Sequence, residues 1–219
     1  MPPPSSPTEK LVVFTRFPRP GRTKTRLIPA LGAAGAAELQ KRMAEHTFLQ
    51  CRALAAARNA AIEVRYEGGT AQEARQWIPG GLGCAPQNEG SLGERLARCV
   101  SAGFAEGMKR VVVIGSDCPA LTPAMMAKGF ALLEEHDLVL GPAHDGGCYL
   151  IGFSRPVCFA WHDIDWGTEK VLRQFLESAA KIGLNWTLLP PLADIDRPED
   201  LHLLADCSNG FHFIPATDE

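Results

Sequence analysis

The residues best suited to chemistry in this sequence lie in a short basic loop near its beginning. An apolar run at residues 11–14 leads into a loop that contains two prolines and Gly21, and the chain has no acidic residue between Glu9 and Glu38. The cations of this loop are Arg16, Arg19, Arg22, Lys24 and Arg26. Side chains and exposed backbone N–H groups on a constrained loop can hold an anion with several oxygens. The segment therefore predicts a phosphate site, and the alternative is a solvated turn whose arginines face water.

Within the loop, the residue types suit different parts of a phosphate. Gly21 permits close approach of the backbone, Lys24 supplies a point charge, and Arg26 supplies a planar fork for phosphoryl oxygens. The segment lacks the G-x-x-x-x-G-K-[ST] pattern of a Walker A loop. The polar loop at residues 87–91 adds Gly90 and Ser91 as candidate nucleotide contacts.

Asp117 directly follows the strand predicted at residues 110–116, whose apolar residues 111–114 indicate a buried central position. Thr122 and Pro123 already supply the start of the next helix, so Asp117 is not needed as its cap. A carboxylate near the basic loop would neutralise the loop unless a cation or a phosphate lies between them. Because Mg²⁺ binds one or two carboxylates together with phosphate oxygens, Asp117 is a candidate metal ligand.

Asp145, Gly146 and Gly147 lie between two apolar runs, a pattern typical of a short hairpin. The alternative is that the two glycines let a sugar or nucleotide lie against the backbone, with Asp145 as a hydrogen-bond acceptor or base. Trp166 precedes a predicted helix and could place its indole in a cleft, although a core position is the alternative.

Asp194 and Asp196 form the last acidic turn. Asp196 could bind a metal or could form a capping box with Glu199, whereas no such structural role accounts for Asp194. The six histidines form no H-x-x-x-H pair, and none is assigned as a ligand.

Hydrophobic periodicity predicts the elements that position these residues. The predicted strands are residues 11–14, 61–66, 82–86, 110–116, 138–141, 148–152 and 185–189; the predicted helices are 33–58, 70–77, 92–106, one beginning at Thr122, one at 168–182 capped by Thr168, and a short one within 194–201. This alternation predicts an α/β fold with a mostly parallel sheet, helices on both faces and a partly antiparallel edge. Ligands in such sheets lie beyond the carboxyl ends of the strands, so the basic loop, Asp117 and the last acidic turn are expected on one rim.

Length and composition narrow the class of protein. With 219 residues, 46% of them hydrophobic, we expect one domain at residues 10–206, a disordered leader at 1–9 and a tail at 207–219. The net charge of −3 and a pI near 6.1 argue against a broad nucleic-acid or membrane surface. Seven cysteines without a C-x-x-C pair indicate reduced thiols. Without a membrane span or signal peptide pattern, a cytoplasmic location is expected.

Five segments in order carry a resemblance over most of the chain: the FxRxPxPGxxKTRL opening, GSDCP, GPAHDGGCYLIG, the W-G-T before a helix, and DIDRPEDL. Together they resemble a bacterial family of GT-A-like proteins, a domain-of-unknown-function group described as glycosyltransferases and linked in some members to arsenosugar synthesis. More distantly, the sequence is similar to molybdenum cofactor guanylyltransferase and phospholactate guanylyltransferase. Cys148 and Gly167 depart from the residues that the family more often has at those positions.

The resemblance implies a single-domain, Rossmann-like nucleotide-diphospho-sugar transferase fold with Mg²⁺, or Mn²⁺, as cofactor. It implies that Lys24 and Arg26 face phosphates, that Asp117 and Asp196 hold the metal, with Asp194 as the alternative, and that residues 145–147 and Trp166 line the acceptor side. The catalytic candidates are Lys24, Arg26, Asp117 and Asp145; the nucleotide-binding candidates are Arg16, Gly21, Arg22, Lys24, Arg26, Gly90 and Ser91.

We therefore expect a Mg²⁺-dependent glycosyltransferase with a nucleotide-sugar donor and a small-molecule acceptor. The alternative is a nucleotidyltransferase that releases pyrophosphate from a nucleoside triphosphate. A third hypothesis is a nucleotide-binding module without turnover. The sequence does not indicate the base, the sugar, the acceptor or the oligomeric state.

Overall fold

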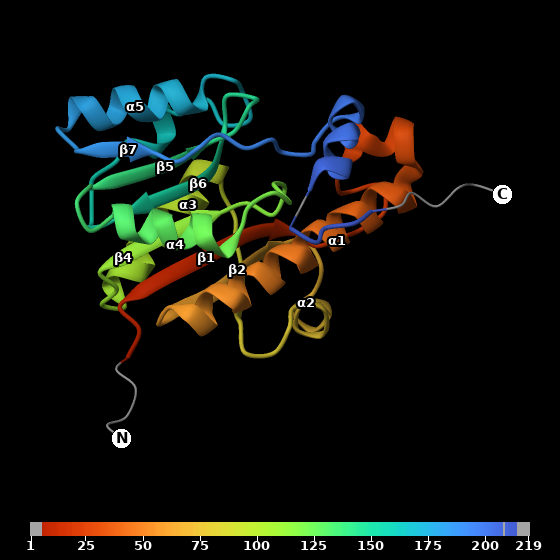
Figure 1. Ribbon diagram of the computed structural model, residues 1–219, viewed down its shortest axis with the longest axis horizontal. Helices are drawn as coiled ribbons and strands as arrows, with labels where there is room; N and C mark the ends of the chain where they lie inside the picture. Colours follow the sequence, from red (N-terminus) through yellow and green to blue (C-terminus); the bar gives the residue numbers. More distant parts are fainter. Residues whose placement is uncertain (1–5, 208, 214–219) are drawn as a thin grey trace.

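The computed structural model describes residues 6–207 and 209–213. They form a seven-stranded sheet, in the order β3-β2-β1-β4-β6-β5-β7, between two layers of helices (Figure 1). The strands are β1 (Glu9–Arg16), β2 (Ala60–Glu67), β3 (Gly83–Pro86), β4 (Arg110–Ile114), β5 (Leu138–Pro142), β6 (Cys148–Phe153) and β7 (Trp186–Leu188). The α-helices are α1 (Ile28–Ala57), α2 (Ala71–Trp77), α3 (Leu92–Ala105), α4 (Pro123–Leu132) and α5 (Val171–Lys181), and the 3₁₀ helices are η1 (Thr25–Leu27), η2 (Trp161–Asp163) and η3 (Pro198–Asp206).

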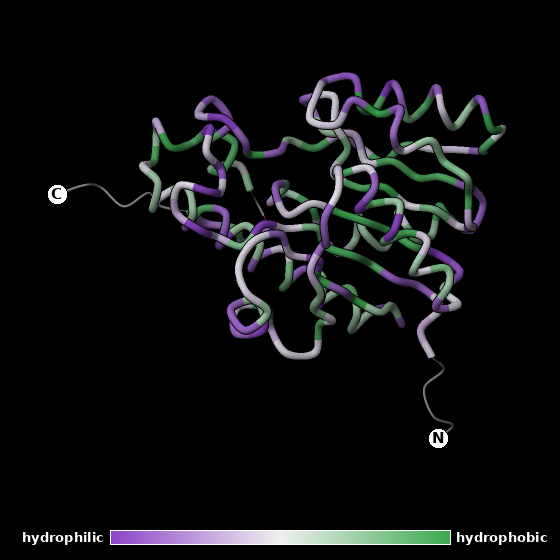
Figure 2. Tube along the Cα trace, turned by 180° about the vertical axis from the view of Figure 1, so that it is seen from behind, coloured by the Kyte–Doolittle hydropathy of each residue, from purple (hydrophilic) through white to green (hydrophobic). Residues whose placement is uncertain are grey.

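The central strands are buried on both faces, which is why their sequences are continuously apolar. In β1, Leu11 and Val13 pack with residues of α1, α2 and α4, whereas Val12 packs with residues of α3 and α5 on the opposite face. The hydrophobic residues of these strands run through the middle of the molecule, and polar residues gather in the connections (Figure 2). The expected layering of helix, sheet and helix is confirmed.

The strand directions agree with the expected mostly parallel, mixed sheet. β2, β3 and β4 extend the sheet in parallel with β1, and β7 is parallel to β5. β6 is antiparallel to both of its neighbours, β4 and β5. The later strands therefore form the partly antiparallel side of the sheet, and within it the hairpin of β5 and β6 places the antiparallel strand beside β4.

The start of α4 agrees with the prediction from the sequence, whereas the start of α5 does not. Thr122 caps α4 through its side chain, and Pro123 follows in the first turn, as predicted. The prediction that Thr168 caps α5 was wrong: the cap position is Lys170, whose side chain makes no capping hydrogen bond. Thr168 Oγ1 instead donates to the Asp165 carbonyl, at 2.8 Å, so this threonine stabilises the turn that precedes the helix.

A third, smaller hydrophobic cluster lies beyond the carboxyl ends of the strands, next to the first half of α1. Leu27 from the basic loop, Ile195 from the acidic turn and Phe211 from the C-terminal segment are 0%, 1% and 3% exposed and belong to this cluster. Phe211 falls in the region expected to be a tail, and Glu9, expected in the leader, is already part of β1. Residues 1–5 and 214–219 lie outside the described residues. The cluster joins the loop that carries the cations to the turn that carries the aspartates.

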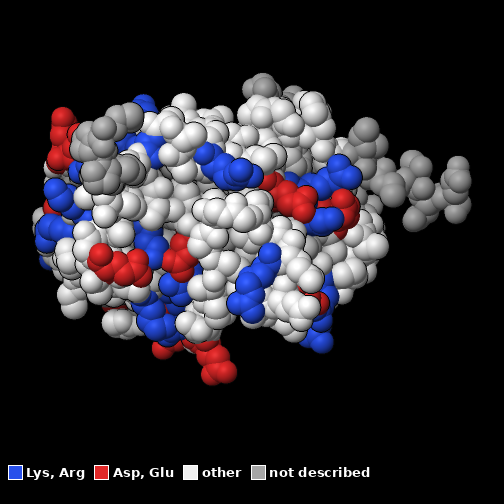
Figure 3. All heavy atoms as spheres, turned by 90° about the horizontal axis from the view of Figure 1, so that it is seen from below, with Lys and Arg blue, Asp and Glu red and all other residues white. Residues whose placement is uncertain are grey.

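The sequence predicts neither a membrane span nor a disulfide framework. Among the described residues, no helix is both long enough and apolar enough to cross a membrane. No disulfide joins cysteines within the described part of the chain. On the face seen in Figure 3, Lys and Arg side chains are interspersed with Asp and Glu side chains and form no continuous basic surface.

Candidate functional site

Lys24 is the point at which the distant parts of the site meet. Its backbone is left-handed, with φ 50° and ψ 45° at the start of η1, a conformation that costs energy for a residue with a side chain. Its buried ammonium donates to the Ile195 carbonyl at 2.6 Å and lies 3.0 Å from Asp117 Oδ2 and 3.5 Å from Asp196 Oδ1. Burial disfavours the charged form, but the two carboxylates outweigh it and raise the pKa of Lys24. The structure thus brings together residues up to 172 positions apart.

The carboxylate of Asp196 pairs with two cations and does not cap a helix. Its Oδ2 accepts a hydrogen bond from Arg26 Nη1 at 2.5 Å. Although burial alone would raise the pKa of Asp196, Lys24 and Arg26 lower it below its ordinary value. The capping box of Asp196 with Glu199 is not formed, because Asp200 accepts from the backbone N–H of Asp196 at 3.0 Å. Asp196 therefore helps to orient the two cations.

Two further cations of the loop are paired, which corrects the interpretation of an unpaired cluster. Arg16 Nε donates to Glu67 at 2.9 Å, and Arg19 Nη2 donates to Glu73 at 2.8 Å. Both arginine side chains are more than half exposed, so these pairs contribute little to stability and are open to exchange with a ligand. The reason for the pairing is that β2 and α2 place their glutamates beside the loop.

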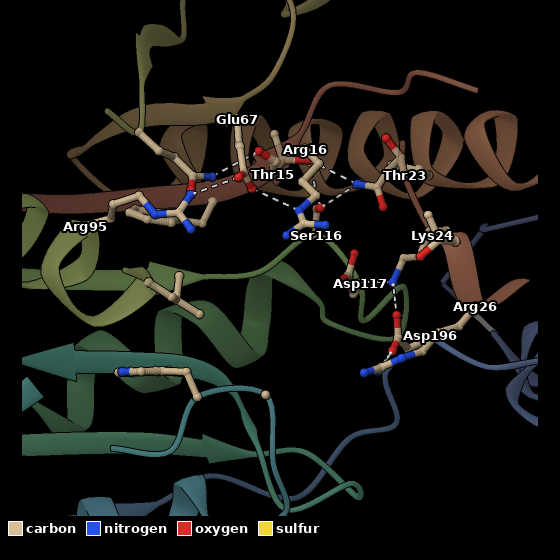
Figure 4. A pocket seen from close by; sticks show the side chains of 17 residues that line it. Thr15, Arg16, Thr23, Lys24, Arg26, Glu67, Arg95, Ser116, Asp117 and Asp196 are labelled. Carbon is tan, nitrogen blue, oxygen red and sulfur yellow. Dashed lines mark hydrogen bonds and ion pairs between the residues drawn. The ribbon is translucent and has the colours of Figure 1, made fainter. Parts of the chain in front are cut away.

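A cavity of about 550 Å³ lies at the carboxyl ends of β1 and β4. Four cations line it, Arg16, Lys24, Arg26 and Arg95, and we call it the cationic cavity (Figure 4). Its floor is polar: Thr15 and Ser116 hydroxyls lie 2.9 Å apart, and Gln40 Nε2 donates to Ser116 at 3.1 Å. The volume and the positive charge suit a nucleotide.

Gln87 and Arg95 were not singled out from the sequence. Gln87 Nε2 donates to the carbonyls of Thr15 and Arg65, at 3.1 and 3.0 Å, and its Oε1 accepts from Arg95 Nη1 at 2.8 Å. The amide thereby ties the ends of β1 and β2 to α3 and fixes Arg95 against the cavity wall. Gln87 directly follows β3, so the rule that ligands lie beyond strand ends would have indicated it.

Four predicted nucleotide contacts do not line this cavity: Gly21, Arg22, Gly90 and Ser91. Ser91 instead forms a capping box with Glu94 at the start of α3. Gly90 has a φ of 109°, and a Cβ there would lie 2.7 Å from a Glu94 carboxylate oxygen. The sequence pattern S-x-x-E predicts this structural role, and Leu92, the first residue of α3, lines the cavity in their place.

A second cavity of about 290 Å³ adjoins the first and shares Phe14, Leu92, Asp117, Trp166 and Gly167 with it. Aliphatic and aromatic side chains of α3, β4, β6 and α5 form most of its walls, and we call it the apolar cavity. A third cavity of about 430 Å³, the outer cavity, is lined by Asp194, Asp196, Asp200, Glu169, Arg26 and Arg197 among others. Asp145 and Asp194 line both of these cavities.

The Asp145 turn forms the predicted hairpin and lies beside a cavity. It is a hairpin turn in which Asp145 Oδ1 accepts from Gly147 N–H at 2.8 Å. Gly146 has a φ of 87°, and a Cβ there would lie 2.3 Å from the Glu169 carbonyl oxygen. Gly146 is therefore required for packing, whereas Asp145 is exposed and Gly147 lines the apolar cavity.

Trp166 lies between the cationic and apolar cavities. Its ring is stacked on Trp161, with centroids 6.3 Å apart and planes at 14°, and its Nε1 donates to the Trp161 carbonyl at 3.1 Å. Trp166 packs against the second core cluster and also lines both cavities. Both hypotheses for this residue therefore apply at once.

Asp194 differs from Asp196 in its electrostatic surroundings. Burial, followed by the nearby carboxylate of Asp145, raises the pKa of Asp194 to about 6. A carboxylate with uncompensated negative neighbours is suited to a divalent cation. Among the described residues, no group of three or more His, Cys, Asp or Glu side chains is arranged to hold a metal. Mg²⁺ commonly takes only one or two carboxylates plus phosphate oxygens, so Asp117 and Asp194 fit such an ion when phosphate is present.

Comparison with known proteins agrees with this geometry. Residues 50–168 match the model of the family described as an uncharacterized protein conserved in bacteria (DUF2064). The chain belongs to this family. The matched region of the DUF2064 protein includes Asp117 and residues 145–147. A search of curated proteins finds no match.

Solved structures confirm the expected fold of this DUF2064 protein. A candidate nucleotide-diphospho-sugar transferase from Desulfovibrio desulfuricans is 29% identical, with a TM-score of 0.85 over 93% of this chain and 89% of that one. Glucosyl-3-phosphoglycerate synthase from Mycobacterium tuberculosis, in complex with Mn²⁺, uridine diphosphate and glucosyl-3-phosphoglycerate, is 17% identical, with a TM-score of 0.56 over 90% and 75%. A cytidylyltransferase from Leptospira borgpetersenii is 12% identical, with a TM-score of 0.56 over 94% and 89%. The chain has the nucleotide-diphospho-sugar transferase fold, and these comparisons support a transferase.

Proposed function

We propose that the protein is a metal-dependent glycosyltransferase that uses a nucleotide-sugar donor and a small-molecule acceptor. The observation that carries this proposal is the contact of Lys24 with Asp117, 3.0 Å apart, at the boundary between the cationic cavity and the apolar cavity. A cation and a carboxylate side by side at strand ends can bind the two sides of a metal–diphosphate group. The likeness to the Desulfovibrio protein supports the choice of donor.

The donor would lie with its nucleoside in the cationic cavity and its diphosphate beside Lys24 and Arg26. Lys24 is held by three oxygen partners, and Arg26 is held by Asp196, so both cations are oriented before a ligand arrives. Such preorganised positive charge stabilises the negative charge that develops on the leaving diphosphate. Arg26 is 61% exposed and can turn its fork toward phosphate oxygens.

Asp117 and Asp194 would hold the metal, with Asp196 left to orient Arg26. When bound, a divalent ion supplies further positive charge for the leaving group; Mg²⁺ and Mn²⁺ both suit carboxylate and phosphate oxygens. The glucosyl-3-phosphoglycerate synthase structure contains Mn²⁺, which supports a divalent ion here. The assignment of Asp194 rests on its uncompensated charge, and that of Asp117 on its place at the end of β4.

Asp145 would act on the acceptor. In the transfer step, an acceptor oxygen forms a bond to the anomeric carbon, the bond from that carbon to the diphosphate breaks, and the acceptor proton passes to Asp145. The exposed position of Asp145, at the border of the apolar and outer cavities, is compatible with contact to a second substrate. The Gly147 N–H, 2.8 Å from Asp145 Oδ1, orients the carboxylate.

Nucleotidyl transfer is the second candidate. It is favoured by the four cations of the cationic cavity, which match a triphosphate better than a diphosphate in charge. In that reaction an acceptor oxygen attacks the α-phosphorus and pyrophosphate leaves.

Product analysis separates these functions. The purified protein is incubated with Mg²⁺ or Mn²⁺, a pool of hydroxyl acceptors, and either nucleotide sugars or nucleoside triphosphates. Release of nucleoside diphosphate from a nucleotide sugar is the expected result, and it should be lost in Asp117→Asn but retained in Asp163→Asn, a control at an exposed aspartate in η2. Pyrophosphate release alone would replace the proposal with the second candidate. Nucleotide binding without turnover, unchanged in Asp117→Asn, would leave a binding module.

A further inference from the structure

The walls of the apolar cavity extend directly from the hydrophobic core. Leu96 of α3, Val113 of β4, Ile151 of β6 and Val171 of α5 all line it and all belong to the second core cluster. Four different elements thus present aliphatic side chains to one space. A ligand body placed there would be removed from water by apolar surface on several sides, which favours an apolar body.

The polar groups in this cavity are largely engaged elsewhere. The Tyr149 hydroxyl donates to the Pro190 carbonyl at 2.9 Å, and the Thr168 hydroxyl donates to the Asp165 carbonyl at 2.8 Å. The Cys118 and Cys148 thiols line the cavity as weak hydrogen-bonding groups. A sugar ring in this space would lose water from several hydroxyls, and the carboxylates that line the cavity would replace only some of those partners, at a cost for each hydroxyl left unpaired. The cavity therefore disfavours a polyol.

The charge at the mouth of the cavity has one sign. Asp117, Asp145 and Asp194 line it, and the described lining residues include no Lys, Arg or His. With Asp117 and Asp194 assigned to the metal, Asp145 remains as the carboxylate that faces the second substrate. A carboxylate accepts hydrogen bonds and repels anions, so the polar end of the ligand should be a donor.

We infer that the second substrate of the proposed reaction is a compact apolar molecule with one hydroxyl or amine end. Its body lies in the apolar cavity and its polar end reaches Asp145. The volume of about 290 Å³ is about twice that of an apolar cavity that binds benzene, so the body is of the size of one or two rings. The inference rests on the proposed function for two statements: that this ligand is a substrate, and that Asp117 and Asp194 hold the metal while Asp145 faces the ligand.

A matched set of small probes tests this preference on the full chain. Benzyl alcohol, benzylamine and benzoate share one ring and differ in the charge of the end group, and glucose is the polyol control. Saturation-transfer NMR titrations with Mg²⁺ at pH 7 should show benzyl alcohol and benzylamine binding at least tenfold more tightly than benzoate or glucose. Glucose binding as tightly as benzyl alcohol, or no binding of either apolar probe, would overturn the inference.

Two leucine variants locate the bound probe. Leu92, 36% exposed, lines the cavity, whereas Leu49, 59% exposed on α1, does not. Leu92→Ser should weaken benzyl alcohol about fivefold because the ring loses apolar contact, and Leu49→Ser should leave it unchanged. Equal affinity in the two variants would place the probe elsewhere and overturn the inference. Asp145→Asn should reduce the preference for benzylamine over benzoate.

A parallel titration with uridine and guanosine diphosphates keeps this test separate from the proposed function. Nucleotides that bind while the apolar probes fail would overturn the inference alone. Apolar probes that bind in the cavity while no nucleotide binds would overturn the proposed function and leave the preference of the cavity in place.

Discussion

The two ends of β1 carry similar charges that are arranged in opposite ways. At its amino end, Glu9 accepts hydrogen bonds from Arg58 at 2.7 Å and Arg110 at 2.8 Å, and Lys10 pairs with Glu63 at 2.5 Å and Glu106 at 2.7 Å. Cations and carboxylates alternate there, and no cavity named above includes them. The charges at this end are suited to hold the sheet together.

At the carboxyl end, paired charges line cavities. Arg16 and Lys24 line the cationic cavity together with their partners Glu67 and Asp117, and Asp194 lines the apolar and outer cavities. The comparison shows that similar charge pairs can either be enclosed by the fold or remain accessible to a ligand that carries both kinds of partner.

The largest effect should come from breaking the charge pairs at the amino end of β1, which we call the balanced end. In Glu9→Gln, Arg58 and Arg110 lose the carboxylate between them, and the side chain of Glu9 is only 6% exposed. We expect the free energy of unfolding to fall by about 3 kcal/mol, measured by urea denaturation. Nucleotide affinity at the other end should not change; a parallel loss of affinity in the folded variant would show that the two ends are coupled.

The next effect should come from Lys24→Ala, which removes the central cation of the site. Nucleotide diphosphate affinity should fall by about 1.5–3 kcal/mol, the range for a charge-assisted contact, measured by calorimetry. Arg22→Ala is the matched control, because Arg22 belongs to the same loop but does not line the cationic cavity. If both variants bind like the wild type, the cationic cavity is not the phosphate site.

A smaller effect should come from Asp194→Asn, with opposite signs for stability and metal binding. Since the folded pKa of Asp194 is raised to about 6, its ionised form destabilises the fold at pH 7. Removing the charge should raise the free energy of unfolding by about 1 kcal/mol after allowance for solvent screening.

The same Asp194→Asn substitution should weaken Mn²⁺ binding in the presence of a nucleoside diphosphate. Asp196→Asn should instead leave the metal bound and disorder Arg26. Manganese titration followed by electron paramagnetic resonance measures the metal affinity of both variants. A loss of metal in Asp196→Asn alone would return the ligand role to Asp196.

The smallest effect should be a change in how the free energy of unfolding depends on pH, caused by the charge pairs of the balanced end. Burial raises the pKa of Glu9, but the hydrogen bonds from Arg58 and Arg110 outweigh it, and the pKa lies below the ordinary value of 4.5. The resulting stability is present above pH 4.5 and is lost as pH falls through the folded pKa. Unfolding curves between pH 3 and 6 should therefore be flatter for Glu9→Gln, and an unchanged slope would exclude Glu9 as the titrating group.

The sequence predicted the parts of the site that depend on strand order. Residues that follow apolar strands in an α/β pattern share one rim, which is why Lys24, Asp117 and the last acidic turn could be expected together. The choice between Asp194 and Asp196 could not be predicted, because it depends on which carboxylate Arg26 reaches from 170 residues away. Ser91 forms the capping box that its local S-x-x-E pattern predicts, and it does not line the cationic cavity.

Other parts of the fold depend on packing that has no local pattern. The insertion of β6 beside β4 is decided by pairing in the sheet, not by its own residues. The burial of Phe211 is decided by the space that Leu27, Leu39 and Ile195 leave beside α1. Neither can be read from periodicity, because each requires the position of another element.

The third hydrophobic cluster affects when the contacts around Lys24 can form during synthesis on the ribosome. Leu27 leaves the exit tunnel early, whereas Ile195 and Phe211, which belong to the same cluster, are synthesised much later. At about 5–20 residues per second, the nascent chain spends several seconds with β1 through β4 made and Lys24 still without its Ile195 carbonyl. The contacts that hold the Lys24 ammonium should therefore form only after residue 195 has left the ribosome.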